Sequence, residues 1–212
     1  MAAVAPRAGG GAAGDRDRGR TLVFTGFMAT FGTIAVSAYF IGTRVLMLSF
    51  VPGVAYQMAA STLVGQNLGA GQPEQARRAG WGAMRSALAA MSLTGVTIAL
   101  LAHPITSLFG ATGRQTIELT VTFIYILAAA QPMMSIDFAL GGALRGAGDT
   151  RFPLLAVFTG LVGARLVLAW LAVHVFDATL TVVWCCLLAD YSTRAVMLVL
   201  RFRTDRWQRV VV

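Results

Sequence analysis

The stretch FPLLAVFTGLVGARLVLAWLAV, residues 152–173, contains a single charged residue, Arg165. Similar apolar runs cover residues 82–102, 116–140 and 178–200. A helix that rises 1.5 Å per residue needs about 20 apolar residues to cross a hydrocarbon layer about 30 Å thick. The runs lack the alternation of polar and apolar residues that is typical of membrane barrels. They therefore predict an all-α integral membrane protein.

The composition supports this class. Hydrophobic residues make up 57% of the chain and charged residues only 12%, with a mean hydropathy of +0.70. A soluble domain carries about a quarter charged residues. The net charge of +8 comes from 17 basic residues, all arginine, which cluster between the apolar runs. We therefore expect the lipid bilayer as a partner and no nucleic acid, because a nucleic-acid footprint needs a continuous basic surface.

Residues 1–64 do not divide into full spans as the later apolar runs do. Residues 1–20 are rich in glycine and alanine, which predicts a disordered cytoplasmic tail. Residues 21–64 are apolar except for Arg44 and Pro52-Gly53, and a turn near residues 31–33 would leave a first arm of about 11 residues, or about 16 Å of helix. That arm is too short to span a bilayer. We expect five full transmembrane helices plus one shortened helix, with a short re-entrant arm as the less favoured alternative.

The arginines also predict the orientation. Connections rich in arginine alternate with connections that are poor in it, and by the positive-inside rule the rich side is cytoplasmic. We therefore expect a multi-pass protein of the plasma (inner) membrane with both termini in the cytoplasm. The arginines on the rich side are Arg77, Arg78, Arg85, Arg145, Arg151, Arg201, Arg203, Arg206 and Arg209.

Two arginine-rich connections have similar sequences, LVGQNLGAGQPEQARRA at residues 63–79 and LRGAGDTRFP at residues 144–153. Each contains a Gly-Ala-Gly core, which permits positive φ and tight helix ends. Pro73 suits the first turn of a helix, and Asp149 and Thr150 can cap the helix that begins near Pro153. Taken one at a time, these residues can be explained as parts of turns between helices, with no catalytic or binding role.

Together the two connections resemble the multidrug and toxic compound extrusion (MATE) family of efflux transporters. The resemblance covers residues 21–212 and implies one six-helix lobe of a twelve-helix transporter, from the end of the seventh helix to the twelfth. The chain would then be the C-terminal half, as a truncated, mis-started or split transporter. The motif residues are Pro52, Gly65, Gln66, Gly69, Gly71, Arg145, Gly146, Gly148, Asp149 and Thr150.

Ionisable residues within the apolar runs are candidates for function, because charge is costly in a membrane. Asp190 and Arg194 stand four residues apart on one helix face, which predicts an ion pair. Asp137 has no cation one turn away and is the first candidate for ion coupling, with Asp190 second. Asp137 must face the bundle interior or a water-filled cavity, pair with another helix, or be protonated. A partner on another helix, such as Arg165 or Arg44, would make a purely structural pair.

The family resemblance does not decide which acid couples. In the sodium-coupled branch an acidic residue on this helix joins the cation site, but the alignment places it near Met134. In the DinF-like branch the coupling acid lies in the N-terminal lobe, and the sequence GARLVLAW around Arg165 looks closer to that branch. Met47, Met58, Met133 and Met134 could line an adaptable drug cavity, or serve only in packing.

The expected function is half of a secondary antiporter. It would export amphipathic or cationic small molecules in exchange for Na⁺ or H⁺ by alternating access, with a missing N-terminal lobe or a homodimer partner. The alternatives are a non-transporting remnant, a membrane interaction subunit, or a flippase of lipid-linked substrates. His103 and His174 have no carboxylate cluster or nucleophile beside them, so we expect no enzyme, no metal site and no cofactor other than the coupling ion.

Overall fold

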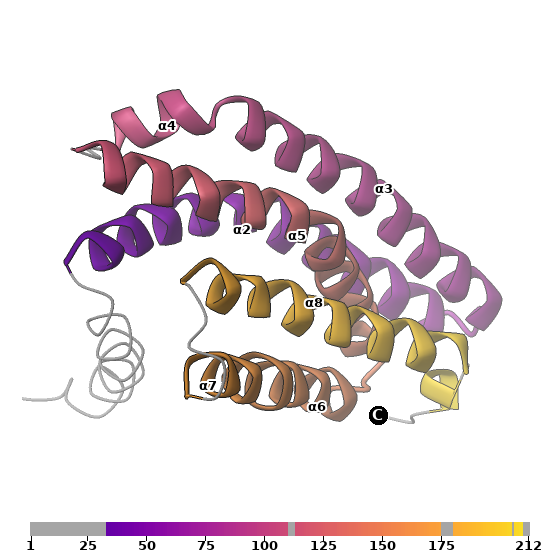
Figure 1. Ribbon diagram of the computed structural model, residues 1–212. Helices are drawn as coiled ribbons and strands as arrows, with labels where there is room; N and C mark the ends of the chain where they lie inside the picture. Colours follow the sequence, from indigo (N-terminus) through magenta and orange to yellow (C-terminus); the bar gives the residue numbers. More distant parts are fainter. Residues whose placement is uncertain (1–32, 110–112, 175–179, 205, 210–212) are drawn as a thin grey trace, which may run out of the picture.

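The computed structural model describes residues 33–109, 113–174, 180–204 and 206–209 (Figure 1). Throughout these residues the regular structure is helical, and five helices are long and apolar enough to cross a membrane. The expected tail at residues 1–20 and the shortened first arm lie outside the described residues. The elements are α2 (Thr33–Gly69), α3 (Pro73–Leu100), α4 (Ala102–Leu108), α5 (Arg114–Gly146), α6 (Arg151–Phe158), η1 (Thr159–Leu166), α7 (Val167–His174), α8 (Leu180–Arg203) and η2 (Arg206–Arg209).

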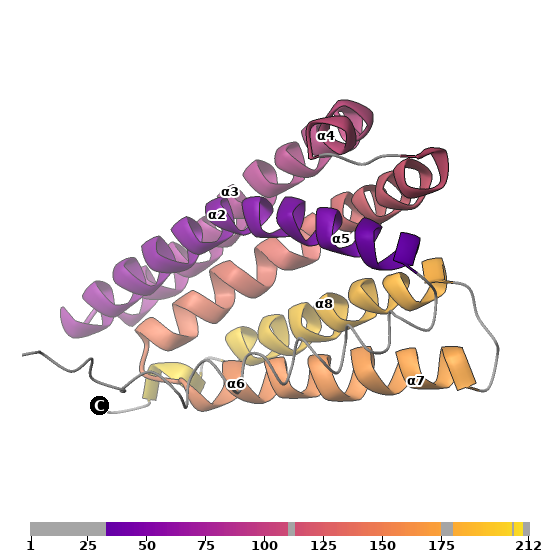
Figure 2. The ribbon, with the colours of Figure 1, turned by 90° about the vertical axis from the view of Figure 1, so that its left-hand side faces the viewer.

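Helix α5 is the centre of the fold. It contacts α2, α3 and α8, and its residues are the most extensively buried of the five spans. Helices α6 and α7 and the π-helical segment η1 between them form one continuous rod that lies beside α8 (Figure 2). In a bilayer both the protein-facing and the lipid-facing sides of a helix are apolar, which is why neither α5 nor the less buried α2 shows an amphipathic pattern.

Glycines set the distance between α2 and α5. A Cβ atom at Gly142 would strike the backbone of Gln57, and one at Gly146 would strike the backbone of Ser61. Gly42 and Gly53 of α2 instead receive the rings of Phe123 and Phe138. Residues 42, 53, 57 and 61 of α2 meet residues 123, 138, 142 and 146 of α5 in that order, so the two helices run parallel. Small residues four apart allow this close approach in membranes.

The helices are longer than the apolar runs suggest. Helix α2 has 37 residues, α3 has 28 and α5 has 33. The connection expected at residues 63–79 is therefore mostly helical, because α2 continues to Gly69 and α3 begins at Pro73, the residue expected in the first turn of a helix. Polar residues end an apolar run but not a helix, since headgroups and water can solvate them while the backbone stays hydrogen-bonded.

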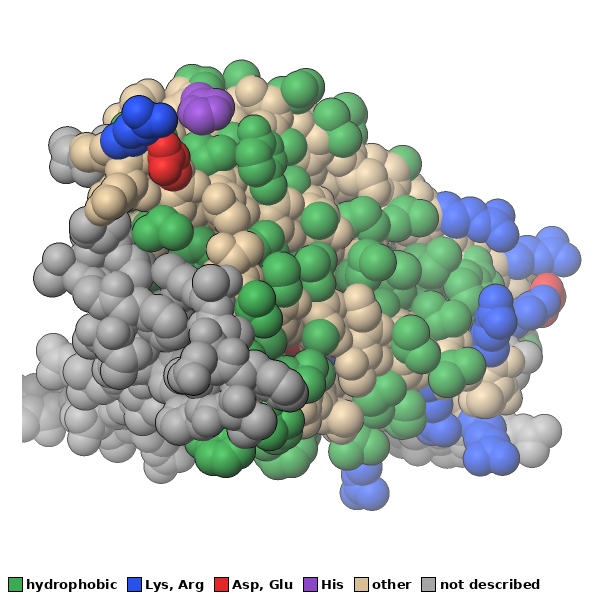
Figure 3. Space-filling model, in the orientation of Figure 1, with side chains coloured by type: hydrophobic (Ala, Val, Ile, Leu, Met, Phe, Trp, Pro, Cys, Tyr) green, Lys and Arg blue, Asp and Glu red, His purple; other side chains and the backbone are tan. Residues whose placement is uncertain are grey.

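Charge is sorted along the length of the molecule. In Figure 3 basic side chains gather at one end, apolar side chains cover the middle, and a single basic, acidic and histidine group lies at the opposite end. The basic end contains the α2–α3 connection, the α5–α6 connection and the end of α8. The arginines are thus grouped as the alternating connections predicted, which is the pattern that a bilayer-spanning bundle requires.

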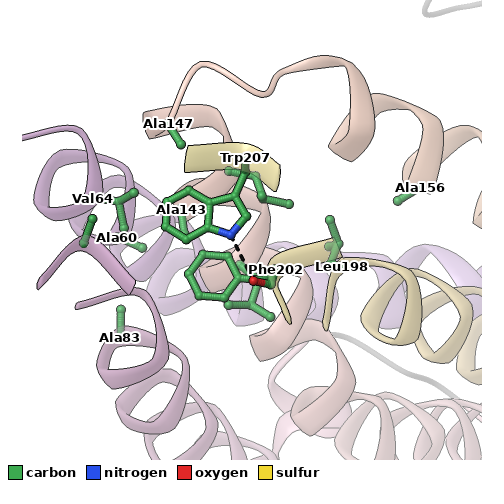
Figure 4. Packing of buried hydrophobic residues seen from close by; sticks show 12 residues of the cluster. Ala60, Val64, Ala83, Ala143, Ala147, Ala156, Leu198, Phe202 and Trp207 are labelled. Atoms are coloured by element: carbon green, nitrogen blue, oxygen red, sulfur yellow. Dashed lines mark hydrogen bonds between the residues drawn. The ribbon is translucent and has the colours of Figure 1, made fainter. Parts of the chain in front are cut away.

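At the basic end, the last turns of the chain fold back onto the helices (Figure 4). The ring of Trp207 in η2 stacks on Phe202 with the ring centres 4.6 Å apart, and its Nε1 donates a hydrogen bond to the Phe202 carbonyl over 2.9 Å. Both side chains are fully buried. Phe202 also lies against Gly80 and Trp81 of α3, so η2 closes the space between α3 and α8.

Candidate functional site

The buried charges of the bundle meet where α8 faces α5. On α8, Arg194 donates to both oxygens of Asp190, from Nε to Oδ1 over 2.5 Å and from Nη2 to Oδ2 over 2.8 Å. The Asp190 side chain is fully buried and that of Arg194 is 10% exposed. The forked geometry is the strongest form of a carboxylate–guanidinium contact. The pair expected from the spacing on one helix is therefore present.

A second carboxylate reaches the same guanidinium from α5. Asp137 Oδ2 lies 3.8 Å from Arg194 Nη1, and the Asp137 side chain is 15% exposed. Asp137 does have a partner on another helix, but it is Arg194 rather than Arg165 or Arg44. Sequence spacing could not identify Arg194 as the partner, because the contact depends on how α5 packs against α8.

The π-helical segment η1 forms the third wall of the site. Gly160 is buried against α8, and a Cβ atom there would collide with the side chains of Asp190 and Arg194. The widened turn and the missing side chain bring the backbone of η1 directly onto the ion pair. Segments of π-helix inside α-helices are frequent at functional sites. The aromatic ring of Tyr191 adds a cation–π contact, with its centre 5.1 Å from the Arg194 guanidinium carbon.

The carboxylates of Asp137 and Asp190 therefore both contact the guanidinium of Arg194. Two other arginines act on them through space, Arg145 on Asp137 and Arg165 on Asp190. The Arg145 side chain folds back along α5 toward Gly141, one turn from Asp137. The site is thus a group of three side chains in contact, with one more arginine on the α5 side and one on the η1 side.

Of the two remaining candidates among the intramembrane arginines, Arg165 borders the site on the η1 side and Arg44 lies apart from it. Arg165 lines a small cavity of about 10 Å³ together with Tyr39, Phe123 and Trp184. Arg44 is exposed on α2 and forms no ion pair with any residue that the structure describes. Its prediction as a charge partner inside the bundle was wrong, because α2 turns that face away from α5 and α8.

The two glycine-rich motifs meet each other at the basic end. A Cβ atom at Gly65 would lie 3.0 Å from the Gly146 carbonyl oxygen, so the end of α2 rests on the end of α5. Gly71 and Gly148 have positive φ, 71° and 85°, and end their helices as left-handed turns. Gln66 and Gly69 are exposed in the last turn of α2, which runs through Pro52 without a break.

Asp149 has a larger role than capping. Its Oδ1 accepts a hydrogen bond of 3.4 Å from the Phe152 N–H, while Thr150 makes no side-chain capping bond. Its Oδ2 accepts two bonds of 2.8 Å, from Nε and Nη2 of Arg201. The Asp149 side chain is 7% exposed. This ion pair ties the α5–α6 connection to the end of α8, a contact across 52 residues that the motif alone does not reveal.

Two other buried side chains of α5 lie outside this charge cluster. Gln131 is fully buried next to Gly95 of α3, and neither of its amide atoms has a hydrogen-bond partner among the described residues. Met134, expected as a possible cavity residue, is also fully buried, whereas Met47 and Met58 are exposed on α2. Within the described ranges, no three histidine, cysteine or acidic residues are arranged to hold a metal ion.

Two solved structures have a fold similar to that of this chain. The eukaryotic MATE transporter AtDTX14 superposes with a TM-score of 0.80 at 20% identity, over 90% of this chain and 42% of that one. A second solved structure, the inward-facing conformation of a multidrug resistance MATE family transporter of the MOP superfamily, gives a TM-score of 0.73 at 21% identity, over 84% of this chain and 40% of that one. These likenesses confirm the all-helical fold of one part of such a transporter.

The sequence relatives agree. The probable multidrug resistance protein NorM of Thermotoga maritima is 31% identical over 194 residues, which cover 90% of this chain and 41% of that protein. The multidrug resistance protein NorM of Burkholderia vietnamiensis is 33% identical over 180 residues, or 82% and 39%. The chain thus spans about two fifths of the length of these relatives. The model of the MatE family matches residues 19–171, and the chain belongs to that family.

Proposed function

We propose that this chain forms the C-terminal lobe of a secondary antiporter that exports amphipathic or cationic compounds in exchange for H⁺ or Na⁺. The observation that carries the proposal is the contact of Asp137 and Asp190 with the single guanidinium of Arg194 inside the bundle. Buried charge at membrane depth is costly and is kept where it serves ion movement. The NorM relatives, named as multidrug resistance proteins, support the direction and the substrate class.

Asp137 is the carboxylate we propose for coupling. Asp190 is held by two short bonds and has no exposed side-chain surface, so an ion could reach it only by breaking the pair. Asp137 has one longer contact of 3.8 Å and some exposed surface. It can therefore take up a proton or a sodium ion while Asp190 keeps Arg194 neutralised.

Ion binding at Asp137 would change the attraction between two helices. With Asp137 ionised, Arg194 draws α5 and α8 together; with the carboxylate protonated or bound to sodium, that attraction weakens while the pair within α8 remains. An ion shifts a conformational equilibrium by the difference in its affinity for the two states. The backbone of η1 at Gly160 rests on the Asp190–Arg194 pair. A movement of α8 relative to α5 would therefore also displace η1. This is the element of alternating access that we assign to the lobe.

Helix α2 offers the surface for the other lobe. Most of its large exposed apolar residues recur three, four or seven positions apart and form one face of the helix, which also carries Arg44. A continuous apolar face of this kind, with exposed methionines, suits contact with a second lobe and with varied hydrophobic substrates. The large apolar residues of this face are Phe40, Met47, Val51, Val54 and Met58.

Transport by proteoliposomes tests the proposal. The chain is reconstituted alone and together with a co-expressed N-terminal lobe of a NorM relative, and uptake of a fluorescent cationic dye is followed under a proton or sodium gradient. We expect uptake only with both lobes, and at least a tenfold loss of gradient-driven uptake in Asp137→Asn. The matched control is Glu118→Gln, an exposed carboxylate on the same helix that pairs only with Arg114 among the described residues.

The outcomes separate the alternatives. Gradient-driven uptake by the chain alone would show that no second lobe is needed. Unchanged coupling in Asp137→Asn would remove that carboxylate from the mechanism. Absence of uptake with both lobes, although they assemble, would favour a non-transporting remnant or an interaction subunit.

A further inference from the structure

A basic cleft of about 620 Å³ opens at the arginine-rich end, between the first turns of α3 and the end of α8. Its walls carry Arg77, Arg78 and Arg85 from α3 and Arg203 from α8, with Trp81 between them. The cleft is separate from the charge cluster around Arg194, and the first motif connection contributes Glu74, Arg77 and Arg78 to its rim.

The charges in the cleft do not cancel. The only acidic residue on its wall is Glu74, which accepts bonds from Arg77 and Arg78 over 3.1 to 3.3 Å. Four guanidinium groups against one carboxylate leave a net charge of +3. Arg85 and Arg203 form no ion pair with any described residue. They come from different helices and are both exposed, so an anion between them would be held from two sides.

The aromatic wall is fixed rather than mobile. Trp81 meets the edge of Phe202 with the ring centres 5.4 Å apart, and Phe202 is itself stacked on Trp207. Next to it, Gly82 leaves open space, with no atom within 4 Å of a Cβ built there. A tryptophan held at the end of a membrane helix lies at headgroup level, where its ring contacts acyl carbons and its N–H can reach polar groups.

The cleft continues into an apolar track along α3. Residues 78, 82, 85, 89, 93, 96 and 100 are spaced by three or four, so they share one helix face, and all are exposed. The face changes from arginine and glycine at its start to Leu93, Val96 and Leu100, which are 67%, 56% and 79% exposed. From Arg85 to Leu100 the helix rises about 22 Å, more than the depth of about 15 Å of one hydrocarbon leaflet.

We infer that this cleft binds the headgroup of an anionic phospholipid from the leaflet on the arginine-rich side, with an acyl chain along the exposed face of α3. The phosphate lies between Arg85 and Arg203, and the first acyl carbons lie against Trp81. Basic pockets between transmembrane helices are suited to anionic headgroups. A soluble anion would use the arginines but not the apolar track, so the two observations together favour lipid.

Such a lipid would also join two elements. Arg85 belongs to α3 and Arg203 to the last turn of α8, and the helices already meet through Gly80 and Phe202. A headgroup shared by both arginines would therefore stabilise the end of the bundle closed by Trp207.

Native mass spectrometry of the full chain tests the site. The protein is released from nanodiscs that contain equal amounts of phosphatidylglycerol and phosphatidylcholine, and the lipids that remain bound are counted. We expect retained phosphatidylglycerol to exceed phosphatidylcholine at least fivefold, and this preference to be lost in the double variant Arg85→Gln/Arg203→Gln. The control Arg151→Gln/Arg206→Gln removes the same charge from exposed positions at the same end but outside the cleft.

Further arms distinguish lipid from other ligands. Quenching of Trp81 fluorescence by brominated phosphatidylglycerol, assigned by its loss in Trp81→Phe, would support the acyl contact. Displacement of the lipid by millimolar inorganic phosphate would show a soluble-anion site and overturn the proposal. Equal retention of both lipids, or a preference unchanged in the cleft variant, would also overturn it. The readout needs no transport, so it is independent of the proposed function.

Discussion

At the scale of single residues, Arg194 is the side chain on which the buried charges depend. It holds Asp190 on its own helix and Asp137 on α5, where little water can replace it. Removing one member of a buried ion pair costs about 3–5 kcal/mol, because the remaining charge loses its counter-ion. Replacing the whole group with uncharged side chains costs far less, since no charge is then left buried.

We expect Arg194→Met to lower the free energy of unfolding by about 3–5 kcal/mol, because Asp137 and Asp190 are left unpaired. In the triple variant Asp137→Asn/Asp190→Asn/Arg194→Met, most of this loss should be recovered. Thermal unfolding in detergent, followed by circular dichroism, measures both. If the triple variant were less stable than the single one, the ion pairs would not be the cause of the loss.

Gly160 provides a test of the contact between η1 and the ion pair. In Gly160→Ala the new methyl group would push against Asp190 and Arg194, and overpacking of this kind costs about 1–3 kcal/mol. Gly163→Ala is the matched control in the same segment, since its Cβ would only touch Thr159 at an ordinary 3.9 Å. Equal melting temperatures of the two variants would contradict the close approach.

The sequence could predict part of this site. The Asp190–Arg194 pair follows from helical spacing, and the need of Asp137 for a partner follows from the cost of an isolated charge. The identity of that partner depends on which helix packs against α5, which local patterns do not contain. The role of Gly160 was hidden for the same reason, since a glycine in an apolar run is most simply read as a packing residue.

At the scale of elements, the contact between α2 and α5 determines the shape of the lobe. Gly142 and Gly146, one helical turn apart, let the backbone of α5 touch that of α2 at Gln57 and Ser61. Since lipid offers no hydrophobic driving force between helices, such close packing supplies much of their attraction. The helical class and the five full spans were predictable from apolar runs, but the ends of the helices were not, because the helices continue past the apolar residues.

In Gly146→Ala we expect a loss of stability of about 2–3 kcal/mol, because the methyl group would meet the rigid backbone at Ser61 rather than a flexible side chain. Gly69→Ala, in the last turn of α2 with nothing within 4 Å of the new Cβ, should be neutral. Chemical denaturation in mixed micelles compares the two. A Gly146→Ala protein as stable as the Gly69→Ala protein would show that α2 can move away at no cost.

At the scale of the whole molecule, the separation of charge along the bundle predicts its orientation. The end with the two motif loops and the end of α8 carries most of the described arginines, and the end with α4 carries a balanced Arg114–Glu118 pair. Positive residues are retained on the cytoplasmic side during insertion. The motif loops should therefore face the cytoplasm.

Cysteine labelling in intact cells measures this orientation. Cys185 and Cys186 are first replaced by alanine, and single cysteines are then placed at Ala70 and Ser107, both exposed but at opposite ends. We expect a membrane-impermeant maleimide to modify Ser107→Cys in intact cells and Ala70→Cys only after lysis. The reverse pattern would mean that the lobe is inserted with the opposite orientation.

The stacked rings of Trp207 and Phe202 have a consequence for biosynthesis. The residues that complete the surroundings of Gly80 and Trp81 are synthesised long after α3 has been inserted. We expect the early helices to stay in a loosened state until η2 has been synthesised. Nascent chains arrested before Trp207 should be cut by cytoplasmic proteases near α3, whereas chains that contain η2 should resist.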